Sequence, residues 1–186
     1  MKILAISGSL RPGSANTSLL RAAARIIGEG IELTIYEGLA NLPHFNPELD
    51  GEVPPISVNN WRKQLRKSDG VIICTPEYAY GMPGVLKNAL DWIVSSGELV
   101  GKPVAAISAS PSEFGGANAH ASLVLTLTAL AANIVLGASL SVPFVSKKLN
   151  NKGELTDPDT AQLLRFVLDA LVAAMKVQPD AAERLL

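Results

Sequence analysis

The feature of the sequence that most constrains the fold is an alternation of short apolar runs with longer segments of helical periodicity. The apolar runs are continuous, without an in–out alternation, which is typical of parallel strands buried on both faces. They cover residues 3–6, 31–36, 70–75, 104–108 and 134–142. Apolar residues recur at helical spacing in segments 16–28, 57–68, 85–96, 117–132 and 157–175. This alternation predicts an α/β sandwich built on a five-stranded parallel sheet.

The strand order is constrained by the handedness of the connections. Crossovers between parallel strands are right-handed, so few topologies remain, and we expect the flavodoxin-like order 2-1-3-4-5 in a three-layer sandwich. A length of 186 residues suits one domain, residues 1–186. The Pro- and Asn-rich segment 39–55 is expected to be irregular and functional, and the tail after Pro179 to be loosely held.

Charge and cysteine content exclude several classes of function. Lys and Arg number 16 and Asp and Glu 17, a formal net charge of -1, which favours neither a nucleic-acid partner nor a membrane-binding polybasic arm. Cys74 is the single cysteine, so an intramolecular disulfide and a Cys-rich metal site are excluded. The N-terminus does not resemble a signal peptide, and polar residues interrupt the longest apolar stretch, 123–136. We therefore expect a cytoplasmic protein.

The loop after the first expected strand has the donors that a phosphate group needs. Residues 7–18 contain hydroxyl groups, an amide, a guanidinium and two glycines, and they lead into a helix N-terminus. The candidate phosphate contacts are Ser9, Arg11, Ser14, Asn16 and Thr17. Neither GxxxxGK[ST] nor GxGxxG is present, so the loop suits a monophosphate better than a magnesium-bound nucleotide. The alternative is a surface turn with a helix cap.

Two further loops follow the third and fourth expected strands, and parallel sheets bind ligands at that end. Residues 75–84 combine two prolines and two glycines with Tyr78 and Tyr80, which suits a planar ring. The tyrosines are alternatively wedges that pack the loop onto the domain. Residues 108–116 are small and include Ser110 and the pair Gly115–Gly116, although a plain strand-to-helix turn would have the same composition.

Other residues favour structural roles. His44 and His120 lack ligand spacing, so a metal site is not expected. Cys74 lies in an apolar strand and is expected to be a core thiol. Asp91 and Trp92 lie off the apolar face of their helix, and we expect Trp92 to anchor a subunit contact rather than to pack inside its own chain.

Taken together, the separated motifs resemble the NADPH-dependent FMN reductase family, whose members include quinone, chromate and azo-dye reductases. The resemblance runs from Met1 to about Leu140 and rests on residues 7–11 with Ser14 and Asn16, residues 76–78, Pro83–Gly84, residues 86–89 and Asp91–Trp92. It implies a flavodoxin-like fold, bound FMN, NADPH or NADH as the electron donor, a small-molecule acceptor, and a homodimer or homotetramer. The flavin would transfer hydride in a ping-pong cycle, and no side chain would be catalytic.

The resemblance also implies a role for each loop. The first loop would hold the FMN phosphate, and residues of the second would line the isoalloxazine and ribityl chain: Pro76, Glu77, Tyr78, Ala79, Tyr80 and Gly81. The third loop, with Ser110, Gly115 and Gly116, would close over the ring. Ala79 stands where the family usually has Asn, and the family's Arg shortly after the glycine pair is absent from residues 117–120, so flavin tuning and substrate recognition are expected to differ.

Three other functions compete with a reductase. An electron carrier of the flavodoxin class would be strongly acidic, unlike this chain. A flavin-dependent sensor would hold FMN without dedicated turnover. A flavin-free hydrolase or transferase is disfavoured because the GxSxG elbow is absent.

Overall fold

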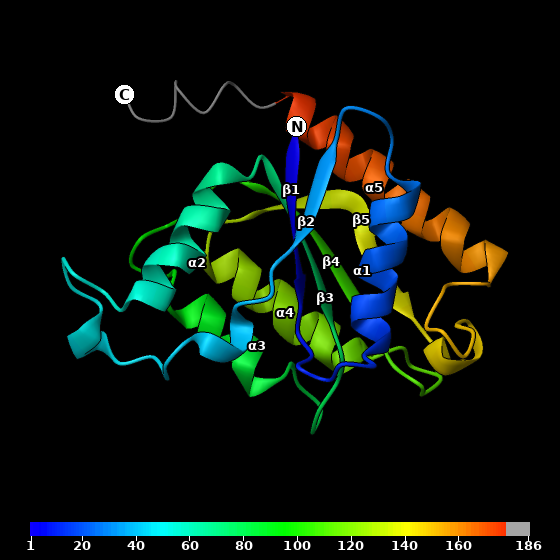
Figure 1. Ribbon diagram of the computed structural model, residues 1–186, viewed down its shortest axis with the longest axis horizontal. Helices are drawn as coiled ribbons and strands as arrows, with labels where there is room; N and C mark the ends of the chain where they lie inside the picture. The colour runs from blue at the N-terminus through cyan, green and yellow to red at the C-terminus, as the bar shows by residue number, and fades with distance from the viewer. Residues whose placement is uncertain (178–186) are drawn as a thin grey trace.

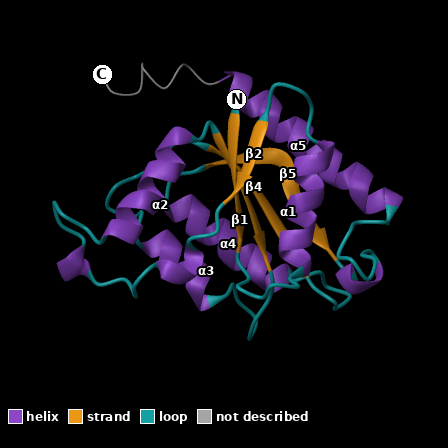
Figure 2. Ribbon diagram, viewed as in Figure 1, coloured by secondary structure: helices purple, strands orange, loops and turns teal. Residues whose placement is uncertain are grey.

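The centre of the molecule is a parallel five-stranded sheet. The computed structural model describes residues 1–177 and places the strands in the order β2-β1-β3-β4-β5 (Figures 1 and 2). The strands are β1 (Lys2–Ser7), β2 (Glu32–Ile35), β3 (Gly70–Thr75), β4 (Pro103–Ala109) and β5 (Asn133–Val142). Every neighbouring pair is parallel. The predicted flavodoxin-like fold and strand order are confirmed. The tail after Pro179 lies outside the described residues.

Helices cover both faces of the sheet. They are α1 (Ala15–Ile26), α2 (Ile56–Lys67), α3 (Gly84–Asp91), α4 (Ala117–Ala129) and α5 (Pro158–Val177). Apolar residues of α1 and α5 pack on one face, and those of α2, α3 and α4 on the other. All six residues of the central strand β3 are buried, as its continuous apolar run predicts. Only α3 is clearly shorter than expected, since it ends at Asp91.

The segment between β2 and α2 is irregular, as predicted, and it packs against α3. Its short 3-10 turns are Leu39–Asn41 and Pro47–Leu49. The Trp92 indole N–H donates to the Pro43 carbonyl at 2.8 Å. The Asn88 side chain donates to the same carbonyl at 2.9 Å and accepts from the Phe45 N–H at 2.7 Å. Trp92 is 0% exposed, so the expectation that it anchors a subunit contact is wrong. The β2–α2 segment therefore covers the side of α3 for which helical periodicity indicated no packing partner.

A buried ion pair fixes the far end of the same segment. The Arg62 guanidinium lies 2.5 Å from the Asp50 carboxylate, and both side chains are 8% exposed. Arg62 also donates to the Trp92 carbonyl, and the Ser95 hydroxyl donates to Asp50 at 2.6 Å. Burial raises the pKa of the Asp50 carboxyl, but the hydrogen bonds from Ser95 and Arg62 and the charge of Arg62 outweigh it. The pKa of Asp50 therefore lies below its ordinary value.

The edge strand β5 is interrupted by a bulge. Val104 of β4 pairs with Ile134, but Ala106 pairs with Ser139, so five residues of β5 span what two of β4 span. Gly137, at φ +86, lies within the bulge, beside the fully exposed Leu136. The imidazole Nε2 of His120 lies 3.2 Å from the Ala106 carbonyl and 2.9 Å from the Ser139 hydroxyl, which ties α4 to both strands here.

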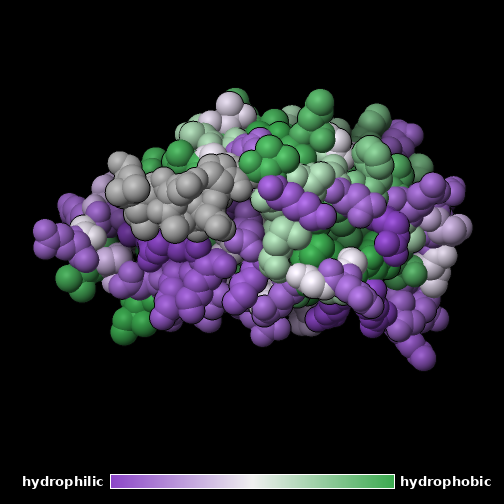
Figure 3. All heavy atoms as spheres, turned by 90° about the horizontal axis from the view of Figure 1, so that it is seen from above, coloured by the Kyte–Doolittle hydropathy of each residue, from purple (hydrophilic) through white to green (hydrophobic). Residues whose placement is uncertain are grey.

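The amino ends of the strands form the end of the molecule seen in Figure 3, where hydrophilic and hydrophobic side chains are interspersed. Within residues 1–177, no helix has the length and apolar character needed to cross a bilayer.

Candidate cofactor and substrate site

The three loops that the sequence singles out meet at the carboxyl end of the sheet, the lower edge in Figure 1. Between them lies a cavity of about 180 Å³. Eight of the expected site residues line it: Ser9, Arg11, Ser14, Asn16, Pro76, Glu77, Tyr78 and Ser110. Parallel sheets bind ligands at this end because the connecting loops diverge there.

The β1–α1 loop presents the start of α1 to this cavity. The Ser14 hydroxyl caps the helix by accepting from the Thr17 N–H at 3.4 Å. The backbone N–H groups of Ala15 and Asn16 have no acceptor within residues 1–177. Arg11 lines the same cavity, and unpaired N–H groups at a helix N-terminus are the kind of donors that bind anions.

Asn16 is fixed by two partners below the cavity. Its side-chain amide donates to the Ala109 carbonyl at 3.3 Å, and its oxygen accepts from the Cys74 thiol at 3.1 Å. Burial raises the pKa of the Cys74 thiol, so the group stays protonated and can donate. The expected core role of Cys74 is confirmed. Asn16 thus links the cavity floor to β3 and β4.

Thr17 does not line this cavity, although it directly follows Asn16. Consecutive helical residues point about 100° apart. The Thr17 hydroxyl instead donates to the Ser7 hydroxyl at 2.8 Å and borders a neighbouring cavity.

The β3–α3 loop contributes Pro76, Glu77 and Tyr78 and then turns away. One carboxylate oxygen of Glu77 accepts from the Ala119 N–H at 3.0 Å, which places negative charge at the N-terminus of α4. Tyr78 and Gly81 exchange backbone hydrogen bonds of 3.0 and 3.1 Å. The two residues between them have φ values of 49 and 61, the geometry of a type I′ turn.

Ala79, Tyr80 and Gly81 are therefore placed in a turn that projects beyond the cavity rather than lining it. Tyr80 is 82% exposed at the tip of this turn.

Only part of the β4–α4 loop lines the cavity, as is the case for the β3–α3 loop. Ser110 lines the cavity, and its hydroxyl lies 3.1 Å from that of Ser112. Gly115 and Gly116 do not line it; both have positive φ. A Cβ atom on Gly115 would lie 3.0 Å from backbone atoms of Val142 and Pro143. In this structure the glycine pair permits close packing of the loop on the end of β5.

Six cavity residues are not among the expected contacts. Gly13, Ala15, Ala109 and Pro111 lie in the expected loops, but the segment with Val145 and Ser146 was missed. Val145 and Ser146 belong to the short turn Val145–Lys147 that follows β5. Because β5 pairs with β4, the segment after it must reach the same edge of the sheet. The expected strand order, which places β5 beside β4, could therefore have indicated that the segment after β5 borders the site.

Arg11 occupies a shared corner of the site. It borders the central cavity, the cavity beside Thr17, and an apolar groove of about 550 Å³. That groove runs between the β1–α1 loop and the β3–α3 loop, from Gly8 to Tyr78 and Val85. A Cβ atom on Gly8 would lie 3.1 Å from Leu86 of α3 and 3.3 Å from Pro76 of the β3–α3 loop, so glycine lets the two loops approach closely.

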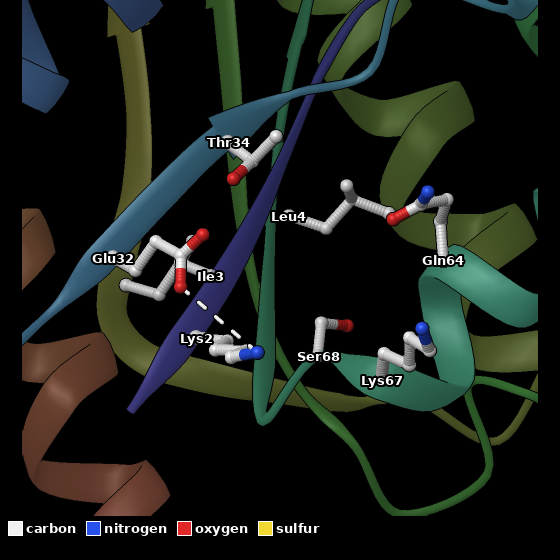
Figure 4. A pocket seen from close by; sticks show the side chains of 8 residues that line it. All are labelled: Lys2, Ile3, Leu4, Glu32, Thr34, Gln64, Lys67 and Ser68. Carbon is white, nitrogen blue, oxygen red and sulfur yellow. Dashed lines mark ion pairs between the residues drawn. The ribbon is translucent and has the colours of Figure 1, made fainter.

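A further hollow, of about 190 Å³, lies at the opposite end of the sheet (Figure 4). The residues around it begin β1 and β2 or end α2, and Lys2 and Glu32 form an ion pair of 4.0 Å across the two strands. It is remote from the three loops, so it is not part of the candidate site.

Comparison with known proteins agrees with this geometry. Residues 1–147 match the family described as NADPH-dependent FMN reductase. An NAD(P)H-dependent FMN reductase of Pseudomonas aeruginosa is 34% identical over 173 residues, covering 92% of this chain and 93% of the relative. A quinone reductase of Escherichia coli is 32% identical over 174 residues, covering 91% and 93%.

Among solved structures, the flavoenzyme NAD(P)H:(acceptor) oxidoreductase FerB of Paracoccus denitrificans superimposes with a TM-score of 0.83 at 30% identity. The match covers 94% of this chain and 97% of FerB.

Proposed function

Since the chain belongs to the NADPH-dependent FMN reductase family, we propose that it reduces a quinone or a similar small acceptor and that its FMN occupies the cavity between the three loops. The use of FMN and of NAD(P)H follows from the family. When bound, FMN supplies hydride transfer between the nicotinamide and the acceptor, in what we propose is a ping-pong cycle. The rest of the reaction depends on how the chain binds and orients its ligands.

The observation that carries the proposal is the donor set of the phosphate corner. The N–H groups of Ala15 and Asn16 are unpaired within the described residues, and Ser9, Ser14 and Arg11 surround the same space. A phosphate monoester is an acceptor of several hydrogen bonds with a double negative charge, and this corner offers donors and one guanidinium. The residues present therefore fit the phosphate end of FMN.

The remaining lining residues suit the rest of the cofactor. Pro76, Glu77 and Tyr78 stand on one side of the cavity and Ser110 and Ser146 on another. We propose that they hold the ribityl chain and border the ring. The Glu77 carboxylate, engaged with the first turn of α4, keeps its loop in place instead of taking a proton from substrate.

The test of this assignment is the response to Arg11→Ala. Loss of one charge-assisted contact is worth about 1.5–3 kcal/mol. The affinity for FMN should therefore fall about 10- to 150-fold by titration of the flavin-free protein. Riboflavin, which lacks the phosphate, should bind almost as before. The matched control is Arg165→Ala on α5, an exposed arginine remote from the three loops. Equal losses for FMN and riboflavin would overturn the phosphate assignment.

We further propose that the protein is a homodimer or homotetramer that associates through α4. This helix contains no Asp, Glu, Lys or Arg, and its Leu125 side chain is 73% exposed. Leu125→Glu should shift the protein toward monomer in size-exclusion chromatography with light scattering. A wild-type protein that is monomeric at micromolar concentration contradicts this proposal. The cytoplasmic location stays a prediction from the sequence.

A further inference from the structure

A second cavity, of about 330 Å³, lies on the other side of the phosphate loop, between α1 and the segment that follows β2. Ser9 and Arg11 border both this cavity and the central one, whereas Thr17 and Arg21 border only this one of the two. It is therefore adjacent to the proposed FMN site without being part of it.

The polar side of the second cavity is positively charged. Arg11 and Arg21 both line it, and neither has a carboxylate partner within residues 1–177. The hydroxyl groups of Ser9 and Thr17 lie beside them. Glu37 is the one carboxylate among the described lining residues, so two guanidinium groups face a single acidic group. This balance favours an anionic ligand.

The other side of the cavity is apolar. Leu10, Pro12, Ile35 and Leu39 line it with the ring of Tyr36. Tyr36 is half-buried, and its ring centroid lies 4.6 Å from that of Trp61 in the core, which fixes its position. A ligand that fills this space needs an anionic end and an uncharged body.

The position of the second cavity at the end of β2 restricts the class of ligand further. In parallel sheets that bind dinucleotides, the end of the second strand meets the adenosine ribose. An acidic residue there contacts the 2′-hydroxyl of NAD, whereas a nearby arginine accommodates the 2′-phosphate of NADP. Here Glu37 follows β2 by two residues, and Arg21 faces the same cavity from α1. Arg21 is joined by Arg11, so two guanidinium groups and one carboxylate border this place, and the excess of positive charge favours a 2′-phosphate over a free hydroxyl.

We propose that this cavity binds the 2′-phosphorylated adenosine end of NADPH, with Arg21 as the residue that distinguishes NADPH from NADH. Arg11 lies between the two phosphate positions and contributes to both. The inference rests on the proposed function, because it takes a reduced nicotinamide nucleotide as the electron donor. It goes beyond that function by assigning a site and a preference to the donor.

The kinetic test compares Arg21→Ala with Arg25→Ala. Arg25 lies one turn further along α1, lines neither cavity, and pairs with Glu154 at 3.5 Å. With a water-soluble benzoquinone as acceptor, Arg21→Ala should raise the KM for NADPH by about tenfold or more, as expected for loss of a charge-assisted contact. The KM for NADH and both kcat values should stay within about twofold. Arg25→Ala should change neither KM. Equal effects on NADPH and NADH would overturn the proposal, as would a wild-type protein that does not prefer NADPH.

A binding test separates this site from the FMN site. Calorimetry with 2′,5′-ADP and with 5′-AMP should show tighter binding of 2′,5′-ADP to the wild-type protein and equal, weak binding to Arg21→Ala. If Arg21→Ala instead lowers the affinity for FMN and leaves 2′,5′-ADP unchanged, the cavity belongs to the flavin phosphate and the proposal is refuted. This measurement needs no turnover. A protein that binds no FMN would end the proposed function, while the comparison of the two nucleotides would still decide this inference.

Discussion

The turn at Ala79 and Tyr80 is strained, and relieving the strain at one position should stabilise the protein. Ala79 has φ 49 and is exposed, so its side chain contributes backbone strain without burial. A left-handed conformation costs an L-residue about 1–2 kcal/mol. Glycine avoids that cost but loses about 0.5–1 kcal/mol through the greater freedom of its unfolded chain. Ala79→Gly should therefore stabilise the fold by about 0.5–1 kcal/mol, which raises Tm by about 1–4 °C in a domain of this size.

The matched control is Ala24→Gly, an exposed alanine within α1. There φ is helical, so the same substitution should destabilise the protein by about 0.5–1 kcal/mol and lower Tm. Thermal unfolding of the flavin-free protein measures both. Ala79→Asn should also raise Tm, since Asn tolerates this conformation. The reasoning is refuted if Ala79→Gly lowers Tm as Ala24→Gly does.

Other outcomes follow from contacts elsewhere in the fold. Hydrogen bonds from the Thr160 hydroxyl, Lys148 and the Thr160 N–H hold the pKa of Asp157 at about 2. The Asp157 carboxylate thus caps the N-terminus of α5, and its stabilising effect should be complete above about pH 4 and lost as the pH falls toward 2. An NMR titration of the Asp157 carboxyl with a midpoint near pH 4 would contradict this prediction. Arg62→Met leaves the buried Asp50 carboxylate without its cation and should cost about 3–5 kcal/mol in urea unfolding. Trp92→Phe should cost about 0.5–3 kcal/mol, because the smaller ring leaves a cavity at a fully buried position, although the carbonyl that accepts the indole N–H keeps a second donor. Light scattering should show an unchanged oligomeric state.

The fold could be predicted from the sequence because its strands are short, continuously apolar and separated by clear helical periodicity. The central strand β3 shows why this works: buried on both faces, it has no polar residue before Thr75, its last position. The loops at the carboxyl ends were also predictable, since strand order determines which loops meet.

Details of the site depended on local geometry that residue types do not reveal. Asn16 and Thr17 were expected to share one phosphate, yet helical rotation directs them to different cavities. The type I′ turn was not foreseen because Ala-Tyr lacks the Asn-Gly signal for such turns. Trp92 was misassigned because helical periodicity describes one helix, whereas the cover over Trp92 comes from residues near Pro43, far away in sequence.

The bulge in β5 also bears on how the chain behaves when crowded. A straight edge strand offers a continuous row of N–H and C=O groups that can template another extended chain, the first step toward fibrous aggregates. Here one edge strand is bent at Gly137, and the strand at the other edge, β2, has only four residues. Neither border of the sheet provides a long, flat ladder. The sheet borders thereby disfavour association by strand addition. This leaves the helical faces for the association proposed above, where contacts depend on specific side chains and can form closed assemblies.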